Sequence, residues 1–266
     1  MTNPVVVVGG GAIAAGAVPL LRQLAAQRRV GMFNTFAVKG LFAWNDPAHL
    51  GTIGLQAGDL DLAGISGAEV LLVGVPDDEI GRDWLGSVGA QWREVTAVEL
   101  VASLVINAAP TPRSVLYDAL AAVCGPMYTS DAVPMTAARA AADLAAWLPD
   151  GGVVQARRDS AGFWLGRTFP TRHLGSVRFS PDGGGRRAAV HIVSNVTGHD
   201  RDHTADDIVE VWSADGPILT PMERIARLQR ASDEGCGAVL QLGVDVGAID
   251  ALVAVAGRPL WPYRAG

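Results

Sequence analysis

The chain has 266 residues, of which 49% are hydrophobic, and a formal net charge of −6 with a pI near 5.3. A chain of this length and composition can bury a substantial core, which excludes a disordered protein and allows one large α/β domain or two smaller ones. The charges form no basic stripe, so neither nucleic acid nor an anionic membrane surface is expected as a partner. The composition still allows a binding site for a small neutral or anionic ligand.

The sequence carries few signals for targeting, disulfides or metal sites. Cys124 and Cys236 are too few for a disulfide framework, and no zinc-type spacing accompanies them. The apolar residues 4–21 follow no Lys or Arg and are interrupted by glycines, a pattern typical of a strand and a turn and not of a secretion signal. No uninterrupted apolar run approaches the ~20 residues of a membrane helix. We therefore expect a cytoplasmic protein.

The first predicted elements form a strand–turn–helix unit. Residues 4–8 are a β-branched run without alternation, which is typical of a strand buried on both faces of a parallel sheet. Three glycines at 9–11 turn the chain, and residues 12–28 place apolar side chains at helical spacing. Further strands are expected at 30–35 and 69–74. This pattern predicts an α/β fold with an open parallel sheet flanked by helices.

Glycines after a first strand are a weak signal for a phosphate site. Without side chains, their N–H groups and the following helix N-terminus can approach an anion closely. Gly9, Gly11 and Ala14 match the dinucleotide fingerprint only loosely, and tight turns need glycine for steric reasons alone. No acidic residue lies between this turn and Asp46, although a dinucleotide site places one near the end of the second strand. An NAD-dependent dehydrogenase is therefore not favoured.

The order of several motifs is similar to that of a known family. The motifs are Pro4 to Gly11, Phe33-Asn34-Thr35, Lys39-Gly40, Leu50 to Gly54 and Val70 to Gly74. Over roughly residues 4–80, the chain resembles the central domain of thiamine-diphosphate-dependent enzymes such as acetolactate synthase. The resemblance implies a Rossmann-like scaffold that in some members holds FAD, ADP or another nucleotide and in others is empty.

The resemblance also implies a set of cofactor-binding positions. They are Gly9, Gly10, Gly11, Thr35, Lys39, Gly40, Gly51, Gly54 and Gly74. Val38 replaces a glycine of the family's loop, which puts any left-handed backbone there in doubt. Lys39 is the only lysine among 21 basic residues, and we expect it to contact a phosphate or a carboxylate. The alternative, that the glycines serve turns alone, stays open.

Groups that thiamine-diphosphate catalysis requires are not found in the sequence. The family's catalytic glutamate belongs to a pyrimidine domain, and this chain starts directly at the central domain. The Mg²⁺ site of the family uses Gly-Asp-Gly followed by Asn, and the nearest echo, Asp182 with Asn195, has the wrong spacing. Thiamine diphosphate and Mg²⁺ are therefore expected only if a partner chain supplies the missing motifs.

A second, smaller α/β domain is expected at residues 131–266, after a nucleotide-binding-type domain at 1–130. An Ala-rich helix at 135–148 and a strand at 153–157 open it. This part weakly resembles the family's diphosphate-binding domain, shortened and without its metal site.

Two further clusters of polar residues lie in this second half. His199 and His203 are four residues apart and are compatible with a metal site on a helix, although a solvated loop is the favoured interpretation. Residues 157–173 combine arginines with Trp164 and His173, which is compatible with an anion clamp, although an interface or a salt-linked surface is favoured.

Two hypotheses on function follow. The first is a non-catalytic or auxiliary subunit, or a nucleotide-binding module, that forms a homo-oligomer or assembles with a separate catalytic chain. Seven tryptophans, some of them expected at an interface, favour it. The alternative is a small enzyme that uses a nucleotide cofactor such as FAD, an ADP-type nucleotide or NAD. A groove at the glycine turn would favour a ligand, and a turn filled by side chains would not.

Overall fold

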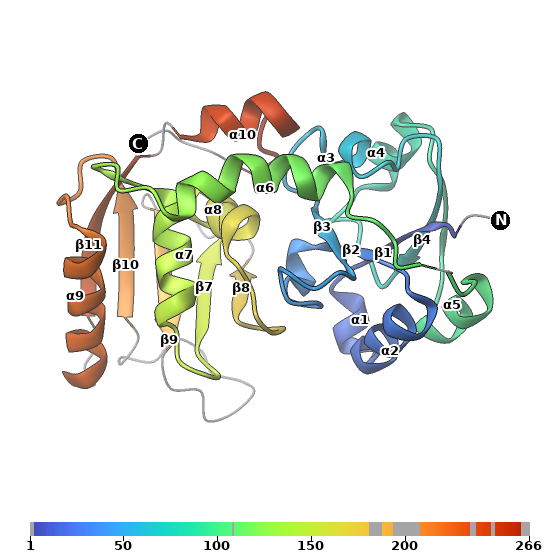
Figure 1. The fold of residues 1–266 in the computed structure, drawn as a ribbon, viewed down its shortest axis with the longest axis horizontal. Coiled ribbons are helices and arrows are strands. Elements are labelled where there is room, and N and C mark those ends of the chain that lie inside the picture. The colour runs from blue at the N-terminus through green and yellow to red at the C-terminus, as the bar shows by residue number, and fades with distance from the viewer. Residues whose placement is uncertain are drawn as a thin grey trace. The chain divides into compact units, whose positions relative to one another are not determined.

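The computed structural model describes residues 3–107, 109–180, 188–193, 208–234, 238–245 and 248–261 (Figure 1). Contacts between Cα atoms divide the chain into two compact units. The N-terminal unit comprises the chain up to Ala121 together with residues 172–174 and 253–260, and the second unit comprises the remainder. The expectation that the second unit is a degenerate diphosphate-binding domain stays a proposal.

The N-terminal unit is built on a five-stranded parallel sheet in the order β3-β2-β1-β4-β5. The strands are β1 (Val5–Val8), β2 (Met32–Thr35), β3 (His49–Ile53), β4 (Glu69–Val73) and β5 (Gln91–Glu94). Val7 of the central strand pairs with Phe33 on one side and with Leu72 on the other. The α/β fold with an open parallel sheet is confirmed.

Helices cover both faces of this sheet. They are α1 (Gly11–Ala14), α2 (Val18–Arg28), the 3-10 helix η1 (Phe36–Val38), α3 (Asp59–Leu62), α4 (Arg82–Ser87), α5 (Ala97–Ser103) and the start of α6 (Val115–Tyr128). In Figure 1, α1, α2 and α5 lie on one side of the sheet, and α3 and α4 lie on the other. The strand β1 is apolar on both faces because Val6 and Val8 pack with α2 and α5, whereas Val7 packs with α3 and α4.

The single helix predicted over residues 12–28 is wrong. The structure has two helices, because Gly16 adopts a left-handed φ of 64° between them. A left-handed residue cannot continue a right-handed helix, and glycine takes this conformation without a Cβ penalty. The interruption places α1 directly after the glycine turn as a helix of only four residues.

The second unit contains a six-stranded sheet in the order β6-β11-β10-β9-β7-β8. Its strands are β6 (Met135–Thr136), β7 (Val153–Arg157), β8 (Val177–Ser180), β9 (Ala188–Val193), β10 (Ile208–Ser213) and β11 (Ala238–Asp245). β9 runs antiparallel to both of its neighbours, and the other pairings are parallel. Its helices are α7 (Ala137–Trp147), α8 (Ser160–Thr168), α9 (Pro221–Glu234) and α10 (Ile249–Ala256), the last of which continues into the N-terminal unit.

A buried ion pair joins two elements of this unit. Arg224 on α9 donates from Nε and Nη2 to the two carboxylate oxygens of Glu210 on β10, at 2.8 and 2.6 Å. Its Nη1 donates to the Ala140 carbonyl at 2.8 Å, and Trp212 Nε1 donates to Glu210 at 2.8 Å. Both charged side chains are 1% exposed. The pair is therefore fully enclosed and well supplied with hydrogen bonds.

The cluster expected to form an interface or a salt-linked surface is divided by the structure. α8 is buried along residues 161–168, with Trp164 1% exposed and Arg167 7% exposed, so the surface interpretation is wrong for these two residues. Arg172 and His173 are exposed and belong to the N-terminal unit. His199, His203, Asp182 and Asn195 lie outside the described residues. Within the described part of the chain, no helix is long and apolar enough to cross a membrane.

Candidate functional site

The glycine turn after β1 lies against the loop after β4. Gly9 N–H donates to the Val73 carbonyl at 3.0 Å, and Gly11 N–H donates to the Gly74 carbonyl at 2.8 Å. A Cβ atom at Gly9 would lie 2.5 Å from Val75 Cα, and a Cβ atom at Gly74 would lie 2.3 Å from Ala12 N. The glycines are needed because two backbone segments approach each other more closely than any side chain permits.

The carboxylate of Glu79 fills the turn. Gly10 N–H donates to its two oxygens, at 3.2 and 3.0 Å, and the Thr35 hydroxyl donates to Oε2 at 2.5 Å. A Cβ atom at Gly10 would lie 2.6 Å from Glu79 Oε1. Glu79 is 9% exposed. The anion at the start of α1 is therefore supplied by the chain itself, in the position where a glycine turn of this type would hold a phosphate.

In this structure, the Glu79 carboxylate occupies the position that a nucleotide phosphate would take at Gly10. A phosphate at Gly10 would lie beside the negative charge of Glu79 and would compete with it for the same N–H group. α1 has four residues, so it adds only a small helix dipole to attract an anion. Binding of a phosphate here would require the Glu79 side chain to leave the turn.

The structure brings together some of the predicted site residues and separates others. Gly54, with a φ of 90°, would place a Cβ atom 2.8 Å from the Glu79 carbonyl. Gly51 packs its backbone against the side chain of Leu116, and Gly40 lies against the carbonyl of His173. Gly74 begins the 74–80 loop, and the predicted residues that contact this loop are Gly9, Gly10, Gly11, Thr35 and Gly54. Gly40 and Gly51 serve other close contacts, and the assignment of all these residues to a cofactor stays a proposal.

Lys39 follows η1 and is 6% exposed. Its charge acts on His49, the first residue of β3: burial, then Lys39 and then Arg113 lower the pKa of His49 from 6.5 to about 3. His49 Nδ1 has no hydrogen-bond partner among the described residues, and its ring meets Tyr117 edge-on at 5.9 Å. The structure thus places Lys39 within electrostatic reach of a neutral imidazole, and a contact of Lys39 with a ligand stays a prediction.

Replacing His49 should remove part of the acid sensitivity of the fold. Between pH 6.5 and about 3, the unfolded chain binds a proton at His49 that the folded chain does not bind, so stability falls as the pH falls through this range. The loss amounts to at most about 1.4 kcal/mol per pH unit. We expect His49→Phe to flatten the change in unfolding free energy between pH 7 and pH 4.5, measured by urea unfolding. His173→Phe, at an exposed histidine, is the control, and equal pH dependence in both variants would contradict the prediction.

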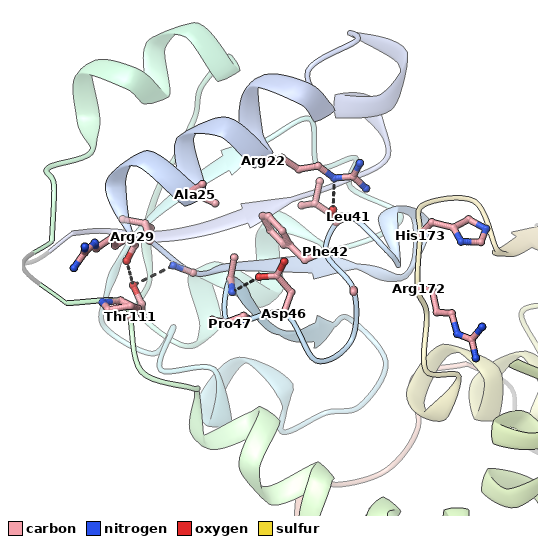
Figure 2. A pocket seen from close by; sticks show the side chains of 16 residues that line it. Arg22, Ala25, Arg29, Leu41, Phe42, Asp46, Pro47, Thr111, Arg172 and His173 are labelled. Carbon is pink, nitrogen blue, oxygen red and sulfur yellow. Dashed lines mark hydrogen bonds between the residues drawn. The ribbon is translucent and has the colours of Figure 1, made fainter. Parts of the chain in front are cut away.

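A pocket separate from the glycine turn lies beside α2 (Figure 2). Its volume is about 470 Å³, and it is bounded by α2, residues 30–31, the 41–48 loop, residues 110–111 and residues 172–173. Residues 30–31 precede β2, and Ala48 precedes β3. The pocket therefore lies near the amino ends of these strands, whereas ligands of open α/β sheets usually bind at the carboxyl ends.

The sequence did not predict a role for Glu79 or the existence of this pocket. Of the residues that line the pocket, Arg172 and His173 belong to the cluster over 157–173 that the sequence analysis describes as compatible with an anion clamp. Glu79 carried a usable signal, because it follows the end of a buried strand, at the sheet edge where the glycine turn also lies. Among the described residues, no group of three or more His, Cys, Asp or Glu side chains could hold a metal ion.

A comparison with protein families identifies a relative for the N-terminal unit. Residues 1–80 match a family model described as the central domain of thiamine pyrophosphate enzymes. The N-terminal unit resembles the central domain of thiamine-diphosphate enzymes. This confirms the resemblance expected from the ordered motifs. The match covers the sheet from β1 to β4 and the Glu79 turn. No curated protein matches the sequence.

Solved structures of thiamine-diphosphate enzymes share the fold over most of the chain. One is a thiamine diphosphate-dependent 4-hydroxybenzoylformate decarboxylase from Rhodococcus jostii RHA1, with a TM-score of 0.51, 14% identity, and coverage of 92% of this chain and 62% of that one. Another, from Mycobacterium smegmatis, is described as a thiamin diphosphate-dependent enzyme, with a TM-score of 0.54, 12% identity, and coverage of 90% and 61%. The chain spans about three fifths of the length of these structures, and at such identities the likeness is one of fold.

Proposed function

We propose that the N-terminal unit is a scaffold whose glycine turn is closed by Glu79, and that the chain acts as a non-catalytic or auxiliary subunit related to thiamine-diphosphate enzymes. The observation that carries the proposal is the pair of contacts from Gly10 N–H and the Thr35 hydroxyl to the Glu79 carboxylate. These donors already have an anionic partner, so the turn keeps its conformation without a nucleotide.

The proposed role includes assembly, with a second copy or with a separate catalytic chain. Trp44 and Trp92 are 42% and 38% exposed, although tryptophan is usually well buried. Exposed aromatic side chains are enriched at protein interfaces, which supports this part of the proposal. The sequence also offers no Gly-Asp-Gly motif followed by Asn at the family's spacing, which supports a non-catalytic role.

The test combines native mass spectrometry with thermal unfolding in FAD, ADP, CoA, NAD, or thiamine diphosphate with Mg²⁺. For the wild-type protein, we expect an assembly without a co-purifying nucleotide, and no rise in Tm that grows with ligand concentration. Glu79→Ala removes the competing carboxylate and should bind ADP more tightly than the wild type does. Glu94→Ala, at a side chain that is 67% exposed, is the control.

The opposite result would support the nucleotide-binding alternative. If ADP or FAD raises the Tm of the wild-type protein and Gly10→Ala abolishes the effect, the turn itself holds the nucleotide and the scaffold proposal is wrong. Gly10→Ala is a suitable probe because its Cβ atom would point at the space that Glu79 occupies.

A further inference from the structure

We propose that the pocket beside α2 binds a small organic anion that carries an apolar body. The proposal does not depend on the function proposed above, because none of the residues that line the pocket belongs to the glycine turn or to the loop that carries Glu79. The pocket volume of about 470 Å³ lies within the range of small-molecule sites.

The charge of the lining favours an anion. Arg22, Arg29 and Arg172 line the pocket together with a single carboxylate, Asp46, which gives a balance of three minus one, or +2, with His173 neutral. The whole chain, in contrast, carries −6. Figure 2 shows Arg29 at one end of the pocket and Arg172 with His173 at the other. Arginine forms strong charge-assisted hydrogen bonds with carboxylate and phosphate groups, so a lining with this charge favours these groups.

The interior of the pocket is apolar. Phe42 lies in the lining with the partly exposed Ala43 and Ala48, and Leu41 and Ala25 are buried behind this surface. In Figure 2, the Phe42 ring lies in the middle, between Arg22 and Asp46. Pro47 and Pro110 add two rigid side chains to the lining. An aromatic or aliphatic body is the chemistry that gains most from such a surface, since burial of apolar area is favourable and requires no further hydrogen bond.

The wall formed by the 41–48 loop is held in place by the protein alone. Arg22 donates from Nε to the Leu41 carbonyl at 2.7 Å and from Nη2 to the Gly40 carbonyl at 3.2 Å. Arg113 donates to the Asp46 carbonyl at 2.5 Å and to the Asn45 carbonyl at 2.7 Å. Asp46 Oδ1 accepts the Ala48 N–H at 2.8 Å. The loop is thus tied at both ends.

The part of the lining formed by residues 29–31 and Thr111 is held in a similar way. Thr111 Oγ1 accepts the Gly31 N–H at 3.0 Å, and Thr111 N–H donates to the Arg29 carbonyl at 3.0 Å. A pocket whose walls are fixed before binding loses little entropy when a ligand enters. Preformed shape, a cationic lining and an apolar interior together support a binding site for an amphipathic anion.

The test is isothermal titration calorimetry of the full chain with phenyl phosphate and with benzoate. Phenol serves as the probe without charge, and inorganic phosphate as the probe without an apolar body. We expect at least one of the two aromatic anions to bind, and both control probes to bind about fivefold or more weakly. The tighter of the two aromatic anions identifies phosphate or carboxylate as the preferred head group.

Matched variants locate the binding. Ala26→Trp should fill the pocket at an exposed position of α2, and Arg29→Glu should reverse a charge of its lining, each with a loss of about fivefold or more in affinity. Gln27→Trp and Arg28→Glu make the same changes at neighbouring residues outside the lining and should bind as the wild type does. Glu79→Ala should leave the affinity unchanged.

Three results would overturn the proposal. The first is the absence of heat with either aromatic anion up to about 10 mM, where a site of useful affinity saturates. The second is binding that Ala26→Trp and Arg29→Glu leave intact, since the anion would then occupy a different part of the protein. Loss of binding in Gln27→Trp as well as in Ala26→Trp would show a general effect on α2 and would also contradict the proposal.

Discussion

Glu210→Gln should destabilise the second unit by about 3–5 kcal/mol, because it leaves the Arg224 guanidinium without its counter-charge in an enclosed site. The Arg224 side chain is 1% exposed, so water cannot replace the lost carboxylate. Nε and Nη2 would each face a neutral amide in place of a charged acceptor. The measurement is urea unfolding followed by circular dichroism, with the transition of the second unit fitted separately from that of the first.

An exposed ion pair of similar length supplies the control. Arg82 Nη2 lies 2.8 Å from Glu94 Oε1, but the Glu94 side chain is 67% exposed. Surface pairs contribute about 0–1 kcal/mol, so Glu94→Gln should change stability little. A Glu210→Gln variant that is as stable as Glu94→Gln would contradict the prediction.

A double variant separates the cost of a lone buried charge from the value of the pair. Glu210→Met together with Arg224→Met removes both charges and keeps apolar volume in the core. We expect it to be more stable than Glu210→Gln, because no uncompensated charge is left, although Trp212 Nε1 and the Ala140 carbonyl each lose a partner. A double variant less stable than the single one would show that the pair stabilises the fold by its net attraction.

The sheet of the N-terminal unit could be predicted because its signal is local. Val6, Val7 and Val8 are all buried, so both faces of β1 are covered, and an uninterrupted β-branched run predicts such a strand. The helix after it was predicted as one element because apolar spacing runs through residues 12–28. The break depends on the left-handed φ of Gly16 and on Pro19, which stands in the first turn of α2 and cannot continue a helix from α1. Pro19 is visible in the sequence as a helix breaker, whereas a glycine in a helical pattern does not reveal whether it is left-handed.

The candidate site was less predictable because it depends on contacts between distant segments. Glu79 lies 69 residues after Gly10, and no short-range pattern joins the two. The glycine motif alone is compatible with a bound phosphate or with a side-chain carboxylate, since both accept backbone N–H groups at a helix N-terminus. Trp164 and Arg167 show the same limit: their composition suggested a surface, whereas the fold buries both.

Gly74→Ala should destabilise the N-terminal unit by about 2–5 kcal/mol, from two additive causes. The φ of Gly74 is 58°, a left-handed conformation that costs an alanine about 1–2 kcal/mol. The new Cβ atom would also lie 2.3 Å from Ala12 N and 2.6 Å from Gly11 C. Relief of this overlap requires the glycine turn to move away from the β4 loop, at a cost of about 1–3 kcal/mol.

Gly16→Ala isolates the first cause from the second. Gly16 has a φ of 64°, close to that of Gly74, but a Cβ atom there would meet nothing within 4 Å. The variant should therefore lose only the conformational cost of about 1–2 kcal/mol. Urea unfolding of both variants gives the difference, which measures the close approach of the turn to the β4 loop. An equal loss of unfolding free energy in the two variants would mean that the glycine turn moves away from the β4 loop at little cost. A turn that moves so easily could also release Glu79 and admit a nucleotide phosphate.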